Sequence, residues 1–346
     1  MNGLFLELRD PLFGVIVFFA LIFIMAFFSY WWGRYKIRED DKSLDRFAKQ
    51  FHKLPSEAEL KALIEKGGLS EKSWLLLATA YEKIGDYEKA IEIYQSLIEL
   101  QRDPLARRDT MLHLGRIYFK AGFLERSKEI FLQILKRHPR TPRALESLLL
   151  VYENLKAYDK AIEVLEPLEE LGVDALKDKL YLKLKIIIND NNLDVSQKSE
   201  KLIALYTKHH KLSYLVYEYL FRHDPKTAWQ YLDQSECKRI ADLLWQLPPD
   251  ALDLDIIAHN GFLRELYSAR GDVALSDESA IFELDMLIKI RSCGKKGATL
   301  QFEYLCKECK QVLPFSFHRC PSCHSIDTLM CELILTKDMI EENYSF

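Results

Sequence analysis

WLLLATAYEKIGDYEKAIEIYQSLI, residues 74–98, aligns without gaps with MLHLGRIYFKAGFLERSKEIFLQIL, residues 111–135, and with LESLLLVYENLKAYDKAIEVLEPLE, residues 145–169. Each stretch has a large apolar residue first, a small or apolar residue four positions later and an aromatic residue seven positions later. Positions spaced by four and seven lie on one face of an α-helix. We therefore predict that each stretch is a pair of helices packed through their apolar faces.

The second half of each stretch carries a small residue followed four positions later by a bulky one. The small residues are Ala90, Ser127 and Ala161. Small side chains allow two antiparallel helices to approach closely, and turn residues such as Gly85 and Gly122 fall between the two predicted helices. The stretches start 37 and 34 residues apart, with a short insertion near residues 101–104. This spacing is typical of tetratricopeptide repeats.

The helical pattern continues with weaker periodicity to residue 292. Residues 175–209 read as a weak repeat broken at NDNNLD, and residues 212–232 place Tyr219 in the aromatic position and Ala228 in the small one. Residues 236–292 predict two or three more helices around Pro248-Pro249. The sequence thus predicts a mainly α protein with an α-solenoid over residues 56–292, and such solenoids bind peptides or other proteins.

Composition and motifs argue against several classes of function. The net charge of −4 over 346 residues gives no basic footprint for nucleic acid. The chain has no Gly-rich phosphate loop, nucleophile elbow or His-Glu-x-x-His motif. We predict a protein that is not an enzyme and does not bind nucleic acid.

A run of 23 uncharged, mostly apolar residues, 11–33, lies between Asp10 and Arg34. At ~1.5 Å per residue it is about 34 Å long as a helix, enough to cross a hydrocarbon core of roughly 30 Å. We predict a single transmembrane anchor over residues 11–33, with the short segment 1–10 on its outer side.

Basic residues predict the orientation of this anchor. Only Arg9 precedes the span, whereas five basic residues follow it closely, namely Arg34, Lys36, Arg38, Lys42 and Arg46. Basic flanks stay in the cytoplasm, so the carboxyl-terminal bulk is predicted to be cytoplasmic. Residues 34–55 are predicted to be a juxtamembrane connector, either simply solvated or in contact with anionic lipid headgroups.

Four of the seven cysteines lie in YLCKECKQVLPFSFHRCPSCHSIDT, residues 304–328. They form two Cys-x-x-Cys pairs, Cys306 with Cys309 and Cys320 with Cys323, and alternating residues on both sides predict short strands. Two such pairs complete a tetrahedral site of four sulfurs for one metal ion, iron or zinc. We therefore predict that residues 299–346 form a small β domain with metal ligands Cys306, Cys309, Cys320 and Cys323.

Other side chains near the cysteines are weaker ligand candidates. His318 and His324 could compete as ligands, but four cysteines already close the site. Cys331 lies on a predicted strand, where packing is the simpler interpretation. A thioredoxin-like redox site would need one pair at the start of a helix, whereas the sequence has two pairs and no such helix.

The order of anchor, repeats and cysteine pairs resembles the lipopolysaccharide assembly protein B family of Gram-negative bacteria, whose members have a rubredoxin-like tail. YLCKEC, HRCPSC and residues 114–131 are most similar to that family. A glycine commonly follows the second cysteine in such knuckles, and here the residue is Lys310. The rubredoxin-like or zinc-ribbon assignment of the tail follows from this resemblance.

The resemblance also implies a function. Members of the family are inner-membrane adaptors in the regulation of lipopolysaccharide biosynthesis. They present the lipid A deacetylase to a membrane-bound AAA+ protease and communicate with lipopolysaccharide and its export machinery. Two other interpretations stay open: a membrane-anchored scaffold for another envelope pathway, and a rubredoxin-type electron-transfer protein.

Overall fold

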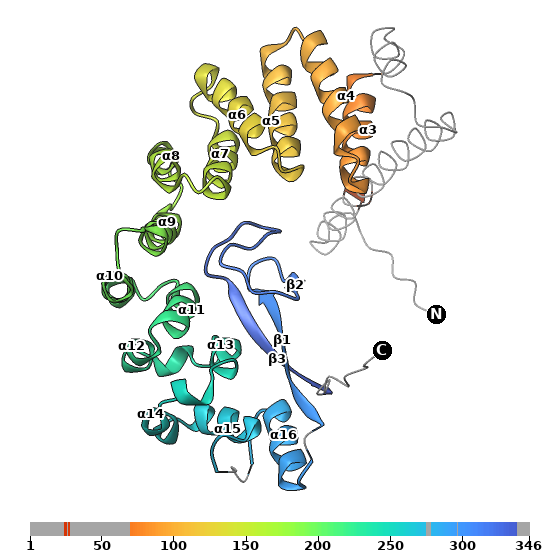
Figure 1. The fold of residues 1–346 in the computed structure, drawn as a ribbon. Helices are drawn as coiled ribbons and strands as arrows, with labels where there is room; N and C mark the ends of the chain where they lie inside the picture. Colours follow the sequence, from red (N-terminus) through yellow and green to blue (C-terminus); the bar gives the residue numbers. More distant parts are fainter. Residues whose placement is uncertain (1–23, 26, 28–69, 275–277, 296, 338–346) are drawn as a thin grey trace, which may run out of the picture. The chain divides into compact units, whose positions relative to one another are not determined.

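The computed structural model describes residues 24–25, 27, 70–274, 278–295 and 297–337 (Figure 1). The chain forms two compact units, divided between Ile130 and Phe131. From residue 70 to this division, the described helices are α3 (Glu71–Ile84), α4 (Tyr87–Leu100), α5 (Pro104–Lys120) and the start of α6 (Leu124–Arg137). They are the first two of the three hairpins predicted from the repeated stretches.

The α3/α4 hairpin follows from local capping and from its small residues. The Ser70 side chain accepts a hydrogen bond from the Ser73 amide and begins α3, while Gly85 ends it with a φ of 82°. Asp86 then caps α4 through the Lys89 amide. Ala78 and Ala90 are fully buried in the core of this hairpin, as the repeat pattern predicts.

In the α5/α6 hairpin, the residue at the small position both packs between the helices and forms a hydrogen bond. Ser127 is fully buried, and its hydroxyl donates to the Gly115 carbonyl of α5 at 2.8 Å. Gly122 has a φ of 81° in the turn between the two helices. A hydroxyl in the small position is tolerated because it has a partner across the hairpin.

The second unit continues the array. Its α-helices are α7 (Pro142–Asn154), α8 (Tyr158–Glu170), α9 (Leu176–Asn189), α10 (Val195–His209), α11 (Ser213–His223), α12 (Pro225–Gln230), α13 (Ala241–Trp245), α14 (Leu254–His259), α15 (Gly261–Arg270) and α16 (Phe282–Ser292). The break predicted at NDNNLD separates α9 from α10, where Asp194 and Gln197 form a reciprocal capping box. Tyr219 and Ala228 are both buried, as predicted.

The described part of residues 236–292 is broken more finely than predicted, into four α-helices rather than two or three. Asp253 and Asn260 each cap a new helix with their side chains, and Pro249 starts a 3-10 turn. Each cap begins a new helix with a new direction, so the apolar residues on either side of it do not share one helical periodicity. The helices α13 and α14 are therefore only five and six residues long.

A three-stranded antiparallel sheet with strand order β2-β1-β3 follows the helices. Strand β1 (Ala298–Cys306) pairs with β3 (Leu329–Lys337) along its whole length, with Tyr304 opposite Cys331. Both strands were predicted. The two-residue strand β2 (Val312–Leu313) was not, because it is too short for any alternation to show.

The predicted membrane anchor and connector, residues 11–33 and 34–55, lie outside the described residues except for Ile24, Met25 and Phe27, which are helical. Among the residues that the structure describes, none of the helices has the length and apolar character needed to cross a membrane.

Candidate metal centre

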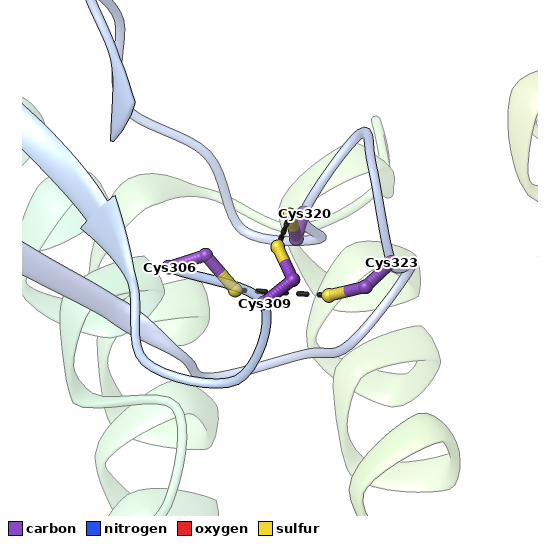
Figure 2. Close-up of side chains that lie close together, drawn as sticks. All are labelled: Cys306, Cys309, Cys320 and Cys323. Carbon is purple, nitrogen blue, oxygen red and sulfur yellow. Dashed lines mark hydrogen bonds between the residues drawn. The ribbon is translucent and has the colours of Figure 1, made fainter. Parts of the chain in front are cut away.

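The four predicted cysteines come together at one end of the small sheet (Figure 2). Cys306 ends β1 and Cys309 follows in the next turn, while Cys320 and Cys323 come from a second loop. All four sulfur atoms lie within 4.8 Å of one another. Sγ of Cys306 is 3.7 Å from Sγ of Cys323, and Sγ of Cys309 is 3.7 Å from Sγ of Cys320.

These distances fit a tetrahedral metal site. Four sulfurs at ~2.3 Å from a central ion would be about 3.8 Å from one another. Disulfide sulfurs would be only about 2.05 Å apart, and all seven cysteines of the structure are free. The sulfur set suits iron or zinc, and the four residues could hold either ion.

The two cysteine loops repeat the same backbone pattern. The Lys310 amide donates to the Cys306 carbonyl at 2.9 Å, and the His324 amide donates to the Cys320 carbonyl at 2.9 Å. Lys310 and His324 each have a φ of 60°. This is the left-handed conformation that favours glycine, so Lys310 keeps the backbone geometry of a knuckle glycine at some conformational cost.

Local hydrogen bonds prepare some of the thiols for deprotonation. Burial opposes the Cys306 thiolate, but hydrogen bonds from the Thr328 hydroxyl and from the amides of Cys309 and Glu308 lower the pKa of Cys306 to about 6. Burial raises the pKa of Cys320 to about 12. A bare set of four thiols is therefore not fully ionised, and metal binding would release protons.

The other candidate ligands take different roles. Nε2 of His318 lies 2.9 Å from a carboxylate oxygen of Glu218 on α11, outside the sulfur cluster. Cys331 lies on β3, and burial together with the nearby charge of Asp242 raises the pKa of its thiol. Neither residue belongs to the cluster of four sulfur atoms.

A buried carboxyl group joins the sheet to the helical array. The Tyr304 hydroxyl of β1 and the Tyr214 hydroxyl of α11 donate to the same oxygen of Asp242 on α13, at 2.9 Å and 2.5 Å. Nearby, Arg239 donates to the Leu329 carbonyl at 3.2 Å and pairs with Asp327 at 2.5 Å. These contacts fix both ends of the cysteine loops against the helices.

The residue before Cys320 makes the longest-range contacts. Arg319 donates to Glu153 on α7 at 2.7 Å and to Asp178 on α9 at 2.8 Å. Its guanidinium carbon lies 5.4 Å from the centre of the Tyr181 ring, and 11% of its side chain is exposed. Sequence reasoning missed this cluster because its members are up to 166 residues apart along the chain.

The array matches a known family over part of its length. Residues 73–108 and 112–170 match the tetratricopeptide repeat family. The matched ranges cover the three stretches that define the period of the sequence, apart from Met111. The helices that begin the array are therefore tetratricopeptide repeats, and this agrees with the predicted solenoid.

Curated proteins are also similar to parts of this chain. Lipopolysaccharide assembly protein B of Escherichia coli strain K12 is 31% identical over 137 residues, 39% of this chain and 32% of that protein. Photosystem I assembly protein Ycf3 of Prochlorococcus marinus strain MIT 9211 is 31% identical over 74 residues, 21% of this chain and 43% of that protein. The matched region spans less than half the length of either relative.

Solved structures of helical repeat proteins also resemble part of this chain. A tetratricopeptide repeat protein from Parabacteroides merdae is 16% identical, with a TM-score of 0.38, covering 64% of this chain and 86% of that one.

Proposed function

We propose that the protein is an adaptor that regulates lipopolysaccharide biosynthesis at the bacterial inner membrane. The observation that carries the proposal is the 31% identity with lipopolysaccharide assembly protein B over 137 residues. The repeats supply a binding surface, since tetratricopeptide repeat proteins generally act as scaffolds for other proteins. The similarity of the cysteine loops to that family adds support from a second part of the chain.

The proposed clients follow from the resemblance. The adaptor would bring the lipid A deacetylase to a membrane-bound AAA+ protease and respond to lipopolysaccharide and its export machinery. Residues 11–33 would anchor it by a single span, with the repeats in the cytoplasm. The orientation is supported by the basic residues that follow the span, Arg34, Lys36 and Arg38 among them.

The proposed metal centre has a structural role in this adaptor. One iron or zinc ion would be held by Cys306, Cys309, Cys320 and Cys323, and it would supply four bonds that tie two loops together. The described sheet has only three strands, one of them two residues long, which is a small core for independent folding. Metal binding should therefore stabilise the fold of the sheet and its contacts with the helices.

Affinity capture of the full membrane-anchored chain, followed by mass spectrometry, tests the proposed function. The expected result is recovery of the protease or the deacetylase above the level obtained with an anchor-only control carrying residues 1–55. Consistent absence of lipid A enzymes, the protease and the export machinery would overturn the assignment to lipopolysaccharide. Recovery of a different set of envelope proteins would favour a scaffold for another pathway.

Electron transfer is the second candidate function, and the exposed Cys309 is the observation that favours it, since this thiol could face a redox partner. An absorption spectrum of the purified chain with elemental analysis distinguishes the two roles. A colourless zinc protein would exclude electron transfer. An iron centre that is reduced and reoxidised reversibly by a partner would support it.

A further inference from the structure

The segment that precedes Cys320 is bound by the helical array much as a peptide would be. Arg319 contacts α7 and α9, and His318 contacts α11. These are the first helices of three successive hairpins, α7/α8, α9/α10 and α11/α12. Successive helices of a repeat array form one extended binding surface. In this structure part of that surface is already occupied by the chain itself.

The surface has the chemistry of a guanidinium site. Glu153 and Asp178 accept separate hydrogen bonds from Nε and Nη2 of Arg319, and the guanidinium carbon lies over the Tyr181 ring. The Glu153 side chain is 12% exposed and the Asp178 side chain 25%. Two largely buried carboxylates without a cation would be costly, so this surface requires a positive partner.

Arginine fits this surface better than lysine. A guanidinium can donate from two nitrogens in one plane and stack on an aromatic ring, whereas an ammonium is a compact, strongly hydrated point charge. Lys185 already lies beside this surface, with its Nζ 5.5 Å from the centre of the Tyr181 ring. Burial lowers the pKa of Lys185 in spite of the opposing charges of Glu218 and Glu153.

Arg319 is held in place by its neighbour in the chain. It directly precedes Cys320, and its Nη1 donates to the His324 carbonyl at 2.8 Å, just beyond Cys323. The guanidinium therefore bridges the second cysteine loop to α7 and α9. If the loop loses its fold, Arg319 loses the backbone that presents it to Glu153 and Asp178.

We propose that the surface formed by Glu153, Asp178 and Tyr181 is a binding site for an arginine-bearing peptide segment of a partner protein, with Arg319 as its internal competitor. The folded cysteine loops keep Arg319 in the site, and loss of the metal exposes the site. This inference rests on the proposed metal-stabilised adaptor, for which it names the partner chemistry and the place of binding.

A labelled peptide tests the competition in the full chain. The probe is a fluorescein-labelled peptide with the sequence of residues 315–323 and serine at both cysteine positions, and binding is followed by fluorescence anisotropy. The chain stripped of metal by a chelator should bind this peptide at least about tenfold more tightly than the metal-loaded chain. Replacing the peptide arginine by glutamine should weaken binding to the stripped chain at least about tenfold, since hydrogen bonds between charged groups are lost.

Variants of the array locate the binding site. Glu153→Gln with Asp178→Asn should abolish the binding gained on stripping. The matched control, Glu163→Gln with Glu166→Gln, removes the same charge from exposed positions on α8 and should bind as the wild type does. Equal loss in the control, equal binding of the glutamine peptide, or no binding to the stripped chain would each overturn the proposal.

Two further measurements distinguish a failure of this inference from unfolding of the chain and from a failure of the proposed metal centre. Circular dichroism shows whether the helices survive stripping. If the helices unfold on stripping, the metal-loaded Arg319→Gln chain is used in place of the stripped chain. This variant should bind the peptide more tightly than the metal-loaded wild type. Equal binding by the two chains would overturn the proposal. A chain that contains one metal ion yet never binds the peptide contradicts only this inference, whereas a chain without bound metal contradicts the metal centre.

Discussion

The buried carboxyl group of Asp242 should control how firmly the small sheet is held against the helices. Its side chain receives two hydroxyl donors, from Tyr304 of the sheet and Tyr214 of the array. The other carboxylate oxygen is buried without a hydrogen-bond partner. Tyr304→Phe removes the donor from the sheet and leaves the carboxyl group with one fewer hydrogen bond in a buried position.

The expected cost can be derived from these contacts. A hydrogen bond to a charged group contributes about 1.5–3 kcal/mol, so Tyr304→Phe should raise the opening equilibrium of the sheet roughly 10- to 140-fold. Asp242→Asn keeps an oxygen that can accept both hydroxyl groups and places an amide where the unpaired oxygen lies. The new amide donors have no acceptor there and carry a cost of their own, but Asp242→Asn should still cost less than Asp242→Leu. Asp242→Leu leaves both hydroxyl groups without an acceptor and should cost at least as much as Tyr304→Phe.

This buried group also predicts a pH dependence. Burial raises the pKa of Asp242 above the usual value of 3.8, although the hydrogen bonds from Tyr214 and Tyr304 act in the opposite direction. The folded protein therefore binds the Asp242 proton more tightly than the unfolded chain does. The resulting stabilisation is complete below pH 3.8 and is lost as the pH rises through the folded pKa. The wild type should lose stability relative to Asp242→Asn over that range.

Hydrogen–deuterium exchange of the full, metal-loaded chain in detergent measures these effects locally. Peptides that cover residues 298–306 and 329–337 report opening of the sheet, after correction for intrinsic exchange rates at each pH. Peptides from α3 and α4, in the other unit, serve as an internal control. Unchanged protection of the sheet in Tyr304→Phe, or an Asp242→Asn cost equal to that of Asp242→Leu, would refute the reasoning.

Three further changes test the metal centre and the repeats. Cys306→Ser should remove the bound metal, counted by elemental analysis, and should expose residues 298–337 to exchange while the helical circular dichroism signal persists; retained metal at one ion per chain would contradict the ligand set. Lys310→Gly should stabilise the metal-bound fold by up to about 1 kcal/mol, because glycine adopts the φ of 60° without strain, and a slower loss of metal to a chelator would show this. Faster loss would argue against strain at this position. Ala161→Leu, at a fully buried small position, should destabilise the α7/α8 hairpin by about 1–3 kcal/mol in thermal unfolding, whereas Lys160→Leu on the same helix should not, and equal effects would show that the position is not closely packed.

The periodic part of the fold could be predicted because its signals are local. The small positions, the turn glycines and the break at NDNNLD each act within a few residues. In the structure, helices end at the turn glycines and at the break, and the small positions lie buried within helices. The third hairpin shows the limit of such signals. Lys156 takes a φ of 57° between α7 and α8, where the earlier hairpins have Gly85 and Gly122. The same left-handed conformation is therefore present in this turn without the glycine that would mark it in the sequence.

The clustering of the four cysteines could also be predicted from the sequence, because a metal site limits the spacing of its ligands along the chain. The contacts that hold the cysteine loops against the helices could not be predicted from the sequence. The contacts of Tyr304 and Arg319 with Asp242, Asp178 and Glu153 join residues that are 62 to 166 positions apart in the chain. No regular spacing in the sequence relates such distant positions. Contacts between the sheet and the helical array therefore become visible only in the folded structure.

Placing Arg319 directly before Cys320 has a mechanical consequence for the whole second unit. A metal ligand and an ion-pairing residue that are adjacent in the chain cannot move independently, because one peptide bond joins them. Any ion that fixes the Cys320 sulfur therefore also restricts Arg319, and through Glu153 and Asp178 it restricts the spacing of α7 and α9. The reverse holds as well, by thermodynamic linkage: a partner that displaces Arg319 from these carboxylates must weaken metal binding by the same free energy. The arginine peptide should accordingly speed metal loss to a chelator, and its glutamine counterpart should not.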